Sequence, residues 1–190
     1  MNIFFFGGTF DPPHIGHYNI VHSCLEVTDK FIIFPNKQSP DKKQPIVNAI
    51  HREKMLHLMF DNSKVEIDDF ELVSNKKNYT IYTIEYLYKK YNNSILNMVI
   101  GLDQLQKIES WYKYDKVIKK VNIYCFNRNN TNIDKSLLQI KNIKFIKDFN
   151  CEISSSLIRK NINNLDKNEL KKFLHKDVIL YIKKNKLYVN

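Results

Sequence analysis

The chain has 190 residues, a net charge of +10 and a hydrophobic fraction of 43%. These values fit a globular chain that folds as one domain with a sizeable core, and they exclude a disordered chain. No apolar stretch approaches the roughly 20 residues that cross a bilayer, and the N-terminus shows no secretory signal. We therefore expect residues 1–190 to form a single domain of a cytoplasmic protein that does not act at a membrane.

The basic charge and the cysteines point to no special class of protein. Only three of the 30 Lys and Arg residues are arginine, and a lysine-rich surface attracts polyanions only in a general way. We interpret most of the charge as compositional drift and expect no nucleic-acid partner. Three widely spaced cysteines without a CxxC pair predict reduced thiols rather than a disulfide framework or a zinc site. These cysteines are Cys24, Cys125 and Cys151.

Short apolar runs alternate with amphipathic segments along the chain, which is typical of a parallel sheet with helices between the strands. We expect a Rossmann-like α/β fold, an open parallel sheet with helices on both faces and with helices at the C-terminal end. In such sheets, ligands bind beyond the carboxyl ends of the strands. In chain order, the expected strands and helices are strand Asn2–Phe6, helix Ile15–Glu26, strand Phe31–Phe34, helix Asn48–Phe60, strand Val65–Phe70, helix Thr80–Tyr91, strand Ile95–Ile100, a helical pair to Lys120 interrupted near Ser110–Trp111, strands Val121–Phe126 and Ile143–Phe149, helix Ser154–Asn161, and helix Asn168–Asn185 in two pieces.

The segment GGTFDPPHIGH, residues 7–17, carries the strongest chemical signal. Gly7 and Gly8 follow a strand and allow a tight turn in which backbone N–H groups approach a phosphate. His14 and His17 are three residues apart, so both rings should emerge on one face of the first helical turn. Gly16 leaves room for a nucleotide beside that helix. Neither GxGxxG nor GxxxxGK[ST] is present, which predicts a phosphate site of a different kind.

A second phosphate signal is ISSSLIR, residues 153–159. Ser154, Ser155 and Ser156 are expected at a helix N-terminus, where hydroxyl and free N–H groups suit phosphate oxygens. Arg159 lies one turn further along, and its planar guanidinium group matches a polyphosphate. The segment therefore predicts contacts to the phosphates of a nucleotide.

Two further segments are expected at the same edge of the sheet. Gly101 closes a strand and permits close backbone approach, and Asp103 can either accept from a ribose hydroxyl or cap the next helix. The indole of Trp111 offers a flat face for a pyridine or purine ring. In NYTIYTIEYL, residues 78–87, Tyr79 and Thr80 precede a helix, so we expect their N–H groups to be unpaired and able to bind a carboxylate.

Taken in order, the segments resemble the bacterial-type nicotinate-mononucleotide adenylyltransferases of the HxGH nucleotidyltransferase superfamily. FPNKQSPDKKQ, HREKML, GLDQL with the later Trp111, and LYIKKNKLY extend the resemblance over essentially the whole chain. One loop departs from the family pattern, because SPDK stands where PPHK or PPHR is usual. Asp41 thus occupies the His position, and Lys37, Lys42 and Lys43 are the candidates for contacts to the triphosphate.

The resemblance implies roles for single residues. His14, His17 and Arg159 are the implied catalytic residues. The implied contacts to ATP and its phosphates are Gly7, Gly8, Thr9, Phe10, Gly16, Lys43, Gly101, Asp103, Ile153, Ser154, Ser155 and Ser156. The implied contacts to the mononucleotide are Tyr79, Thr80, Thr83, Trp111 and Arg128.

The implied reaction joins ATP and nicotinate mononucleotide to give deamido-NAD and pyrophosphate. The family implies direct in-line attack without a nucleophilic side chain, with Mg²⁺ arriving with ATP and no dedicated metal site in the protein. An adenylyltransferase for nicotinamide mononucleotide or phosphopantetheine is the nearest alternative. The chain lacks the further motifs and the length that a tRNA-linked enzyme would need. A nucleotide- or RNA-binding module does not explain the two phosphate motifs. The oligomeric state and the strictness of acid over amide stay open.

Overall fold

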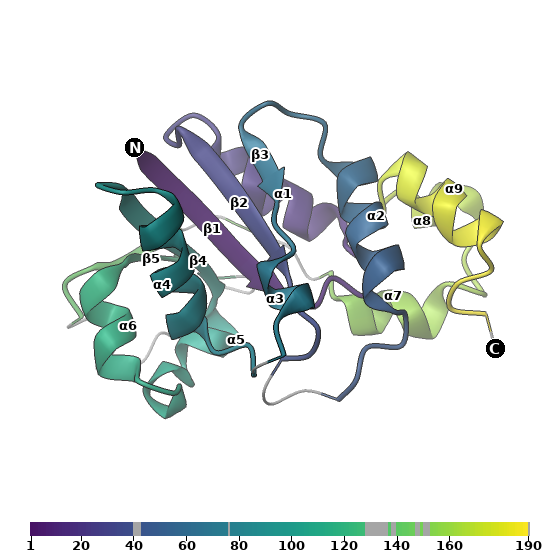
Figure 1. Ribbon diagram of the computed structural model, residues 1–190. Helices are drawn as coiled ribbons and strands as arrows, with labels where there is room; N and C mark the ends of the chain where they lie inside the picture. The colour runs from purple at the N-terminus through teal and green to yellow at the C-terminus, as the bar shows by residue number, and fades with distance from the viewer. Residues whose placement is uncertain are drawn as a thin grey trace.

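The computed structural model describes the chain except residues 40–42, 76, 128–136, 138–139, 147–148, 150–152 and 190. Its centre is a parallel sheet of six strands in the order β3-β2-β1-β4-β5-β6 (Figure 1). None of the helices in the described ranges is long and apolar enough to cross a membrane. The strands are β1 (Asn2–Gly8), β2 (Lys30–Pro35), β3 (Val65–Ile67), β4 (Ile95–Gly101), β5 (Asn122–Phe126) and β6 (Ile143–Ile146).

The strand order reverses beside β1, and this point positions the site. β1 pairs with β2 on one side, where Gly7 stands opposite Phe34, and with β4 on the other, where Phe5 stands opposite Met98. The carboxyl ends of β1 and β4 are therefore neighbours although they lie almost a hundred residues apart. Ligands of open α/β sheets bind at such a switch point. The expectation of an open parallel sheet is confirmed.

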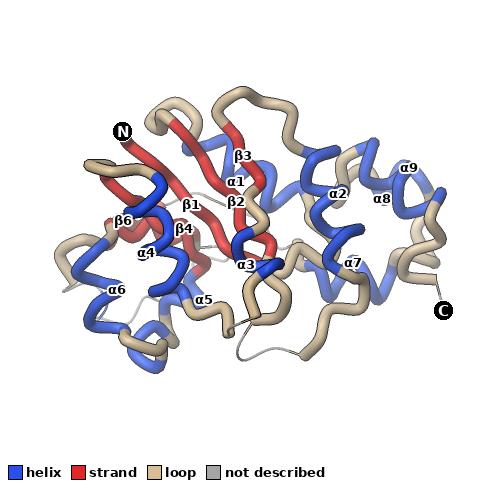
Figure 2. The backbone as a smooth tube through the Cα atoms, in the orientation of Figure 1, coloured by secondary structure: helices blue, strands red, loops and turns tan. Residues whose placement is uncertain are grey.

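Alternating side chains of β1 build a core on each face of the sheet, because successive side chains of a strand point to opposite sides. Ile3 and Phe5 pack with α4, α5 and α6, whereas Phe4 and Phe6 pack with α1. Helices thus cover both faces, as the alternating pattern predicts, and Figure 2 shows the strands between the two groups of helices. The bounds of these helices are α1 Ile15–Cys24, α4 Thr80–Lys90, α5 Leu102–Leu105 and α6 Tyr114–Lys120.

A third cluster of apolar side chains joins α2 (Ala49–Met59) to the C-terminal helices α7 (Ser155–Asn161), α8 (Lys167–Leu170) and α9 (Lys176–Lys184). The expected C-terminal helices are confirmed, and they lie beside α2 (Figure 1). Asn48 caps α2, as predicted, by accepting a hydrogen bond from the N–H of His51 at 3.2 Å.

The expected strand Val65–Phe70 is wrong in its second half. β3 ends at Ile67, and a short helix, α3, spans Phe70–Val73. The reason is local, because the Asp68 carboxylate accepts a hydrogen bond from the N–H of Phe70 at 2.9 Å. Such a side-chain contact competes with the sheet ladder and starts a turn. The interruption expected near Ser110–Trp111 is present as a 3-10 helix, η1 (Ile108–Ser110), between α5 and α6.

The thiols of Cys24 and Cys125 are both buried and free. Burial raises the pKa of Cys24 to about 11 and that of Cys125 to about 12. These thiols therefore stay protonated and act as small core side chains. The third cysteine, Cys151, lies outside the described residues.

Candidate functional site

A cavity of about 450 Å³ opens beyond the carboxyl ends of β1 and β4, at the switch in strand order. Its lining comes from the end of β1, the N-terminal turn of α4 and the segment from β4 to η1. Segments far apart in the sequence thus form one site. Of the residues predicted for the site, it is lined by Gly7, Gly8, Tyr79, Thr80, Thr83, Gly101, Asp103 and Trp111.

The two glycines do not form the tight turn that the sequence predicts. Both belong to β1, and neither has a positive φ; the left-handed residue is Phe10, with φ of 51°. Gly8 is required for a different reason, since a Cβ there would lie 2.9 Å from the Phe10 ring. The ring of Phe10 thus lies against the end of the strand, and it also packs edge-on against the ring of His17, with centroids 4.9 Å apart.

The imidazoles of His14 and His17 lie on the same side of the first turn of α1. Their ring centroids are 3.7 Å apart, with the ring planes 25° from parallel, as the spacing predicts. Both side chains are buried. The backbone N–H of His14 donates to Nδ1 of His17 at 3.1 Å, so the neutral ring of His17 carries its proton on Nε2. That Nε2–H is a donor suited to a phosphate oxygen.

The N-terminus of α1 is less open than its position in the motif predicts. The N–H of Ile15, the first residue of the helix, donates to the carbonyl oxygen of Phe173 at 2.8 Å. The orphan donors of a helix start are therefore partly satisfied by the C-terminal segment. Gly16 is buried and does not line the cavity. This leaves the histidine side chains as the main polar groups of this turn.

The segment ISSSLIR is brought against the first motif. The Ser154 side chain caps α7 by accepting from the N–H of Leu157 at 3.2 Å, and Ser155 Oγ donates to the carbonyl of Pro12 at 2.9 Å. Arg159 Nη1 donates to the carbonyl of Asp11 at 2.5 Å. The two phosphate motifs thus form one surface. Ser156 is exposed, with Oγ 3.3 Å from Arg159 Nη2, and Ile153 packs on the C-terminal cluster.

Two buried charged residues that the sequence did not single out hold these motifs in place. The Asp11 carboxylate accepts from the N–H of Ile46 at 2.8 Å and from the hydroxyl of Tyr188 at 2.7 Å. Arg52 is 1% exposed, and its Nη1 donates to the carbonyl of Thr9 at 2.5 Å. Two features of the sequence could have identified these residues: Asp11 lies inside the first motif, and Arg52 is one of only three arginines in the chain.

The start of α4 forms the far end of the cavity. Tyr79 is the N-cap of the helix, and its N–H donates to the carbonyl of Lys77 at 2.8 Å. The expectation that this N–H is unpaired is therefore wrong, because a local turn engages it. The orphan donors of the helix begin with Thr80, the first helical residue. The hydroxyl of Thr83 is also engaged, since it donates to Glu71 Oε1 at 2.6 Å.

Several polar residues of the cavity were missed by sequence reasoning, among them Asn36, Ser39 and Glu71. Asn36 and Glu71 are each 7% exposed, and Ser39 lies beside Asn36, whose Nδ2 donates to Ser39 Oγ at 2.9 Å. Asn36 Oδ1 has no hydrogen-bond partner among the described residues. Burial raises the pKa of Glu71 to about 7; the hydrogen bond from Thr83 lowers it, and the nearby Asp68 charge raises it.

Aromatic rings form the wall of the cavity beside η1. Trp111 follows η1 and is half-buried. The neighbouring ring of Tyr112 lies 4.6 Å from that of Tyr79, centroid to centroid. Gly101 is the N-cap of α5, so the alternative in which Asp103 caps this helix is wrong. Asp103 instead lines the cavity from the first turn, with Oδ1 2.6 Å from the position that a Cβ on Gly101 would take.

The candidate triphosphate lysines are not brought to this cavity. Lys37 and Lys43 are exposed and do not line it. Asp41, Lys42 and Arg128 lie outside the described residues. Within the described ranges, no group of three or more His, Cys, Asp or Glu side chains is placed to hold a metal ion.

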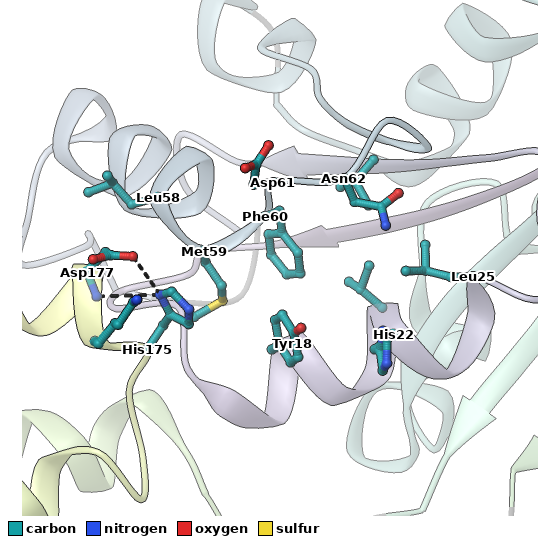
Figure 3. A pocket seen from close by; sticks show the side chains of 13 residues that line it. Tyr18, His22, Leu25, Leu58, Met59, Phe60, Asp61, Asn62, His175 and Asp177 are labelled. Atoms are coloured by element: carbon teal, nitrogen blue, oxygen red, sulfur yellow. Dashed lines mark hydrogen bonds and ion pairs between the residues drawn. The ribbon is translucent and has the colours of Figure 1, made fainter.

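A second cavity, of about 370 Å³, lies between α1, the end of α2 and the start of α9 (Figure 3). The ring of Tyr18 lies there nearly parallel to those of Phe60 and His22, at 14° and 20°. His175 Nδ1 is 3.5 Å from Asp177 Oδ2. None of the residues predicted for the site lines this cavity, which lies away from the switch in strand order. The candidate site is therefore the first cavity together with the surface formed by the two phosphate motifs, whose implied catalytic residues His14, His17 and Arg159 do not themselves line the cavity.

Comparisons with known proteins identify the family of the chain. Residues 5–161 match the Cytidylyltransferase-like family. Proteins named as probable nicotinate-nucleotide adenylyltransferases are similar over almost their whole length: one of Campylobacter jejuni is 35% identical, covering 93% of this chain and 98% of the relative. One of Acholeplasma laidlawii is 36% identical, covering 96% and 95%. The structure of the Plasmodium falciparum nicotinic acid mononucleotide adenylyltransferase complexed with NaAD is 26% identical, with a TM-score of 0.80, and covers 98% of this chain and 97% of that one. The chain therefore belongs to the nicotinate-nucleotide adenylyltransferases of the Cytidylyltransferase-like family.

Proposed function

We propose that this protein transfers the AMP part of ATP to nicotinate mononucleotide, which gives deamido-NAD and pyrophosphate. The observation that carries the proposal is the cavity at the switch point. It combines the end of β1, the N-terminus of α4 and Trp111. Phe6, which lines it, has its ring 5.8 Å from that of His17, one of the two stacked histidines. We assign the phosphate motifs and the aromatic wall to adjoining parts of one site, as transfer between two nucleotides requires.

At the ATP side, the working groups are hydrogen-bond donors and one fixed cation. His17 offers its Nε2–H, and the Arg159 guanidinium is oriented by its bonds to Asp11 and Ser156. We assign His14 and His17 to the triphosphate, with His17 nearest the reacting phosphorus. Arg159 and the serines of α7 hold the β- and γ-phosphates. Donors that are already oriented stabilise the charge of the transition state without further reorganisation.

At the mononucleotide side, we assign the pyridine ring to the face of Trp111, because stacking on an indole suits a flat heterocycle. The carboxylate of nicotinate is assigned to the first N–H groups of α4, beginning with Thr80. The dipole and the orphan donors of a helix start favour a negative group. The buried Asn36 Oδ1, which has no partner among the described residues, is assigned to a ribose hydroxyl.

The reaction needs positioning rather than a nucleophilic side chain. An oxygen of the mononucleotide 5′-phosphate attacks the α-phosphorus of ATP and forms the new phosphorus–oxygen bond. The bond from that phosphorus to the bridging oxygen breaks, and pyrophosphate leaves with the electron pair. Mg²⁺ belongs to the substrate, because it enters bound mainly to the phosphate oxygens of ATP, where it neutralises charge.

We also propose that residues 1–190 act as one domain. The C-terminal segment reaches the first motif through Arg159 and Tyr188, which contact Asp11, and through Phe173, which accepts from Ile15. Removal of the C-terminal helices would therefore disturb the ATP side of the site.

The test is identification of the products. The protein is incubated with MgATP and, in parallel, with nicotinate mononucleotide, nicotinamide mononucleotide or phosphopantetheine. Deamido-NAD is detected by chromatography and mass spectrometry, and pyrophosphate by a coupled enzyme. Formation of both with nicotinate mononucleotide supports the proposal. Products with phosphopantetheine alone, or with none of the three, would refute it.

A further inference from the structure

The carboxyl group of Glu71 is a buried titratable group in the cavity that the proposed reaction leaves without a role. Its Oε1 accepts the hydroxyl of Thr83 at 2.6 Å, and it lies 3.8 Å from the position that a Cβ on Gly7 would take. The carboxyl group therefore sits between the end of β1 and the first turns of α4, at the part of the cavity assigned to the pyridine nucleotide.

The second oxygen of Glu71, Oε2, has no hydrogen-bond partner among the residues that the structure describes. Within the part of the chain that the structure describes, the one hydrogen bond of the Glu71 side chain is the one to Oε1, and no ion pair includes this residue. Glu71 is only 7% exposed and lines the cavity. A carboxyl group in so buried a residue, with one hydrogen bond, is costly unless the group is neutral or a ligand completes it. A neutral carboxylic acid is a hydrogen-bond donor.

The surroundings favour the neutral acid. Burial is the main cause that raises the pKa of Glu71 to about 7; the hydrogen bond from Thr83 opposes it, and the charge of Asp68 adds to it. Lys90 binds Asp68 at 2.6 Å and Glu66 at 2.7 Å, and it forms no ion pair with Glu71. Besides Glu71, the titratable residues that line the cavity are Tyr79 before α4, and Asp103, Lys107 and Tyr112 across the cavity. Tyr86 of α4 donates to Asp68, and Asp69 next to α3 is exposed.

We propose that Glu71 is a specificity residue, which binds the mononucleotide as a neutral acid and donates a hydrogen bond from Oε2 to the carboxylate of the pyridine ring. This inference rests on the proposed function, because it requires a pyridine mononucleotide in the cavity. The first N–H groups of α4, beginning with Thr80, and the acid of Glu71 then both present donors to the same carboxylate. Glu71 is held beside this helix by Thr83, one turn after Thr80.

Ionisation of Glu71 reverses this preference. A carboxylate at this place repels the carboxylate of nicotinate mononucleotide, whereas it can accept a hydrogen bond from the NH₂ group of nicotinamide mononucleotide. The selectivity for acid over amide therefore falls as the pH rises through the pKa of Glu71. The change appears in substrate selection rather than in overall activity, so a purely structural role of Glu71 would not produce it.

The experiment measures kcat/KM for both mononucleotides at about pH 6 and about pH 8.5, with saturating MgATP. The quantity compared is the ratio of acid to amide. Titration of the substrate 5′-phosphate and of the histidines affects both substrates alike and cancels in this ratio. For the wild-type protein we expect the ratio to fall by at least about fivefold, within the roughly 30-fold limit that a group with a pKa near 7 sets. For Glu71→Gln, which cannot ionise, we expect a constant ratio.

Two further variants make the result specific. Asp69→Asn removes an exposed carboxylate two residues away and should keep the wild-type fall. Thr83→Val removes the hydrogen bond that favours the ionised form, so the midpoint of the fall should move to higher pH. Circular dichroism and thermal melting verify that each variant is folded. If Glu71→Gln is not folded, the midpoint of the fall in Thr83→Val decides whether the inference holds.

The inference is overturned by a wild-type ratio that does not change with pH, by a Glu71→Gln ratio that falls as in the wild type, or by an unmoved midpoint in Thr83→Val. In these cases the protein still uses nicotinate mononucleotide, so the proposed function stands. If the protein forms no deamido-NAD above background, both the inference and the proposed function are refuted.

Discussion

Arg159 Nη1 donates a hydrogen bond to the carbonyl oxygen of Asp11 at 2.5 Å, across 148 positions of the chain. The same guanidinium lies 3.9 Å from the Asp11 carboxylate and 3.3 Å from Ser156 Oγ. One arginine therefore joins the phosphate segment of the C-terminal part to the loop after β1. Its planar group is oriented before any nucleotide binds, and orientation of this kind reduces the cost of binding a polyphosphate.

Replacement of Arg159 by lysine should impair the enzyme although the charge is kept, because lysine cannot bind Asp11 and a phosphate with one planar group. Hydrogen bonds to charged groups contribute about 1.5–3 kcal/mol, so we expect a loss of about 10- to 150-fold in kcat/KM for ATP. Lys160→Ala, at the exposed neighbouring position, is the matched control. Full activity of Arg159→Lys would make this arginine an ordinary surface residue.

His17→Ala should lower kcat by about 10²-fold or more, the usual scale for the loss of one oriented donor to a transition state. KM for ATP should change less, because the contact is assigned to the reacting phosphorus. His22→Ala, an exposed histidine on the same helix, controls for general effects on α1. Steady-state kinetics with varied ATP separate the two parameters. If the loss appears only in KM, His17 binds the ground state and does not assist the transfer.

Trp111→Ala should weaken the mononucleotide more than ATP. Stacking of a base on an aromatic side chain contributes about 1–3 kcal/mol, which corresponds to a roughly 5- to 150-fold rise in KM. Trp111→Phe should recover much of the loss, since it restores an aromatic face. The measurement is KM for each substrate at saturation of the other. Equal effects on both substrates would contradict the assignment of the pyridine ring to this wall.

Glu71 should make the stability of the free protein depend on pH. Its pKa is raised from 4.5 to about 7 in the folded state, so between these values the folded protein holds a proton that the unfolded chain has lost. The free energy of unfolding therefore falls as the pH rises through this window and levels off above it.

The size of this effect is bounded by the shift, at about 3 kcal/mol for the raised pKa. Urea unfolding of the wild type and of Glu71→Gln at about pH 5 and about pH 8 measures it, and the difference between the two proteins removes the contribution of all other groups. The free energy of unfolding of Glu71→Gln should increase relative to that of the wild type as the pH rises. A constant difference would mean that Glu71 is ionised throughout.

The sequence predicts the sheet and the two phosphate segments because both depend on local patterns. Short apolar runs define β1 and β4, and the spacing of His14 and His17 is enough to place their rings together. It does not predict the use of single N–H groups. The N–H of Ile15 is bound by Phe173, which is distant in the chain, and that of Tyr79 by a turn whose geometry no motif records.

Residues that act through long-range burial are equally hidden. In the sequence, Glu71 is an ordinary charged residue after a strand. Only its tertiary contacts, with Gly7 of β1 and Thr83 of α4, show that it is buried in the cavity. Gly8 is correctly identified as special, but for the wrong reason, because the ring of Phe10 rather than a turn requires it. Tertiary contacts, which neither propensity nor spacing encodes, decide such cases.

The most direct measurement compares kcat/KM for nicotinate and nicotinamide mononucleotide at about pH 7, with saturating MgATP and one salt concentration. The first-turn N–H groups of α4, which begin with Thr80, favour a carboxylate, and an amide NH₂ would point a donor at donors. Each buried group left unpaired costs about 1–3 kcal/mol, so we expect the acid to be preferred by about tenfold or more. Equal values, or a preference for the amide, would mean that this helix start does not recognise the carboxylate, and the assignment of nicotinate mononucleotide as the preferred substrate would be wrong.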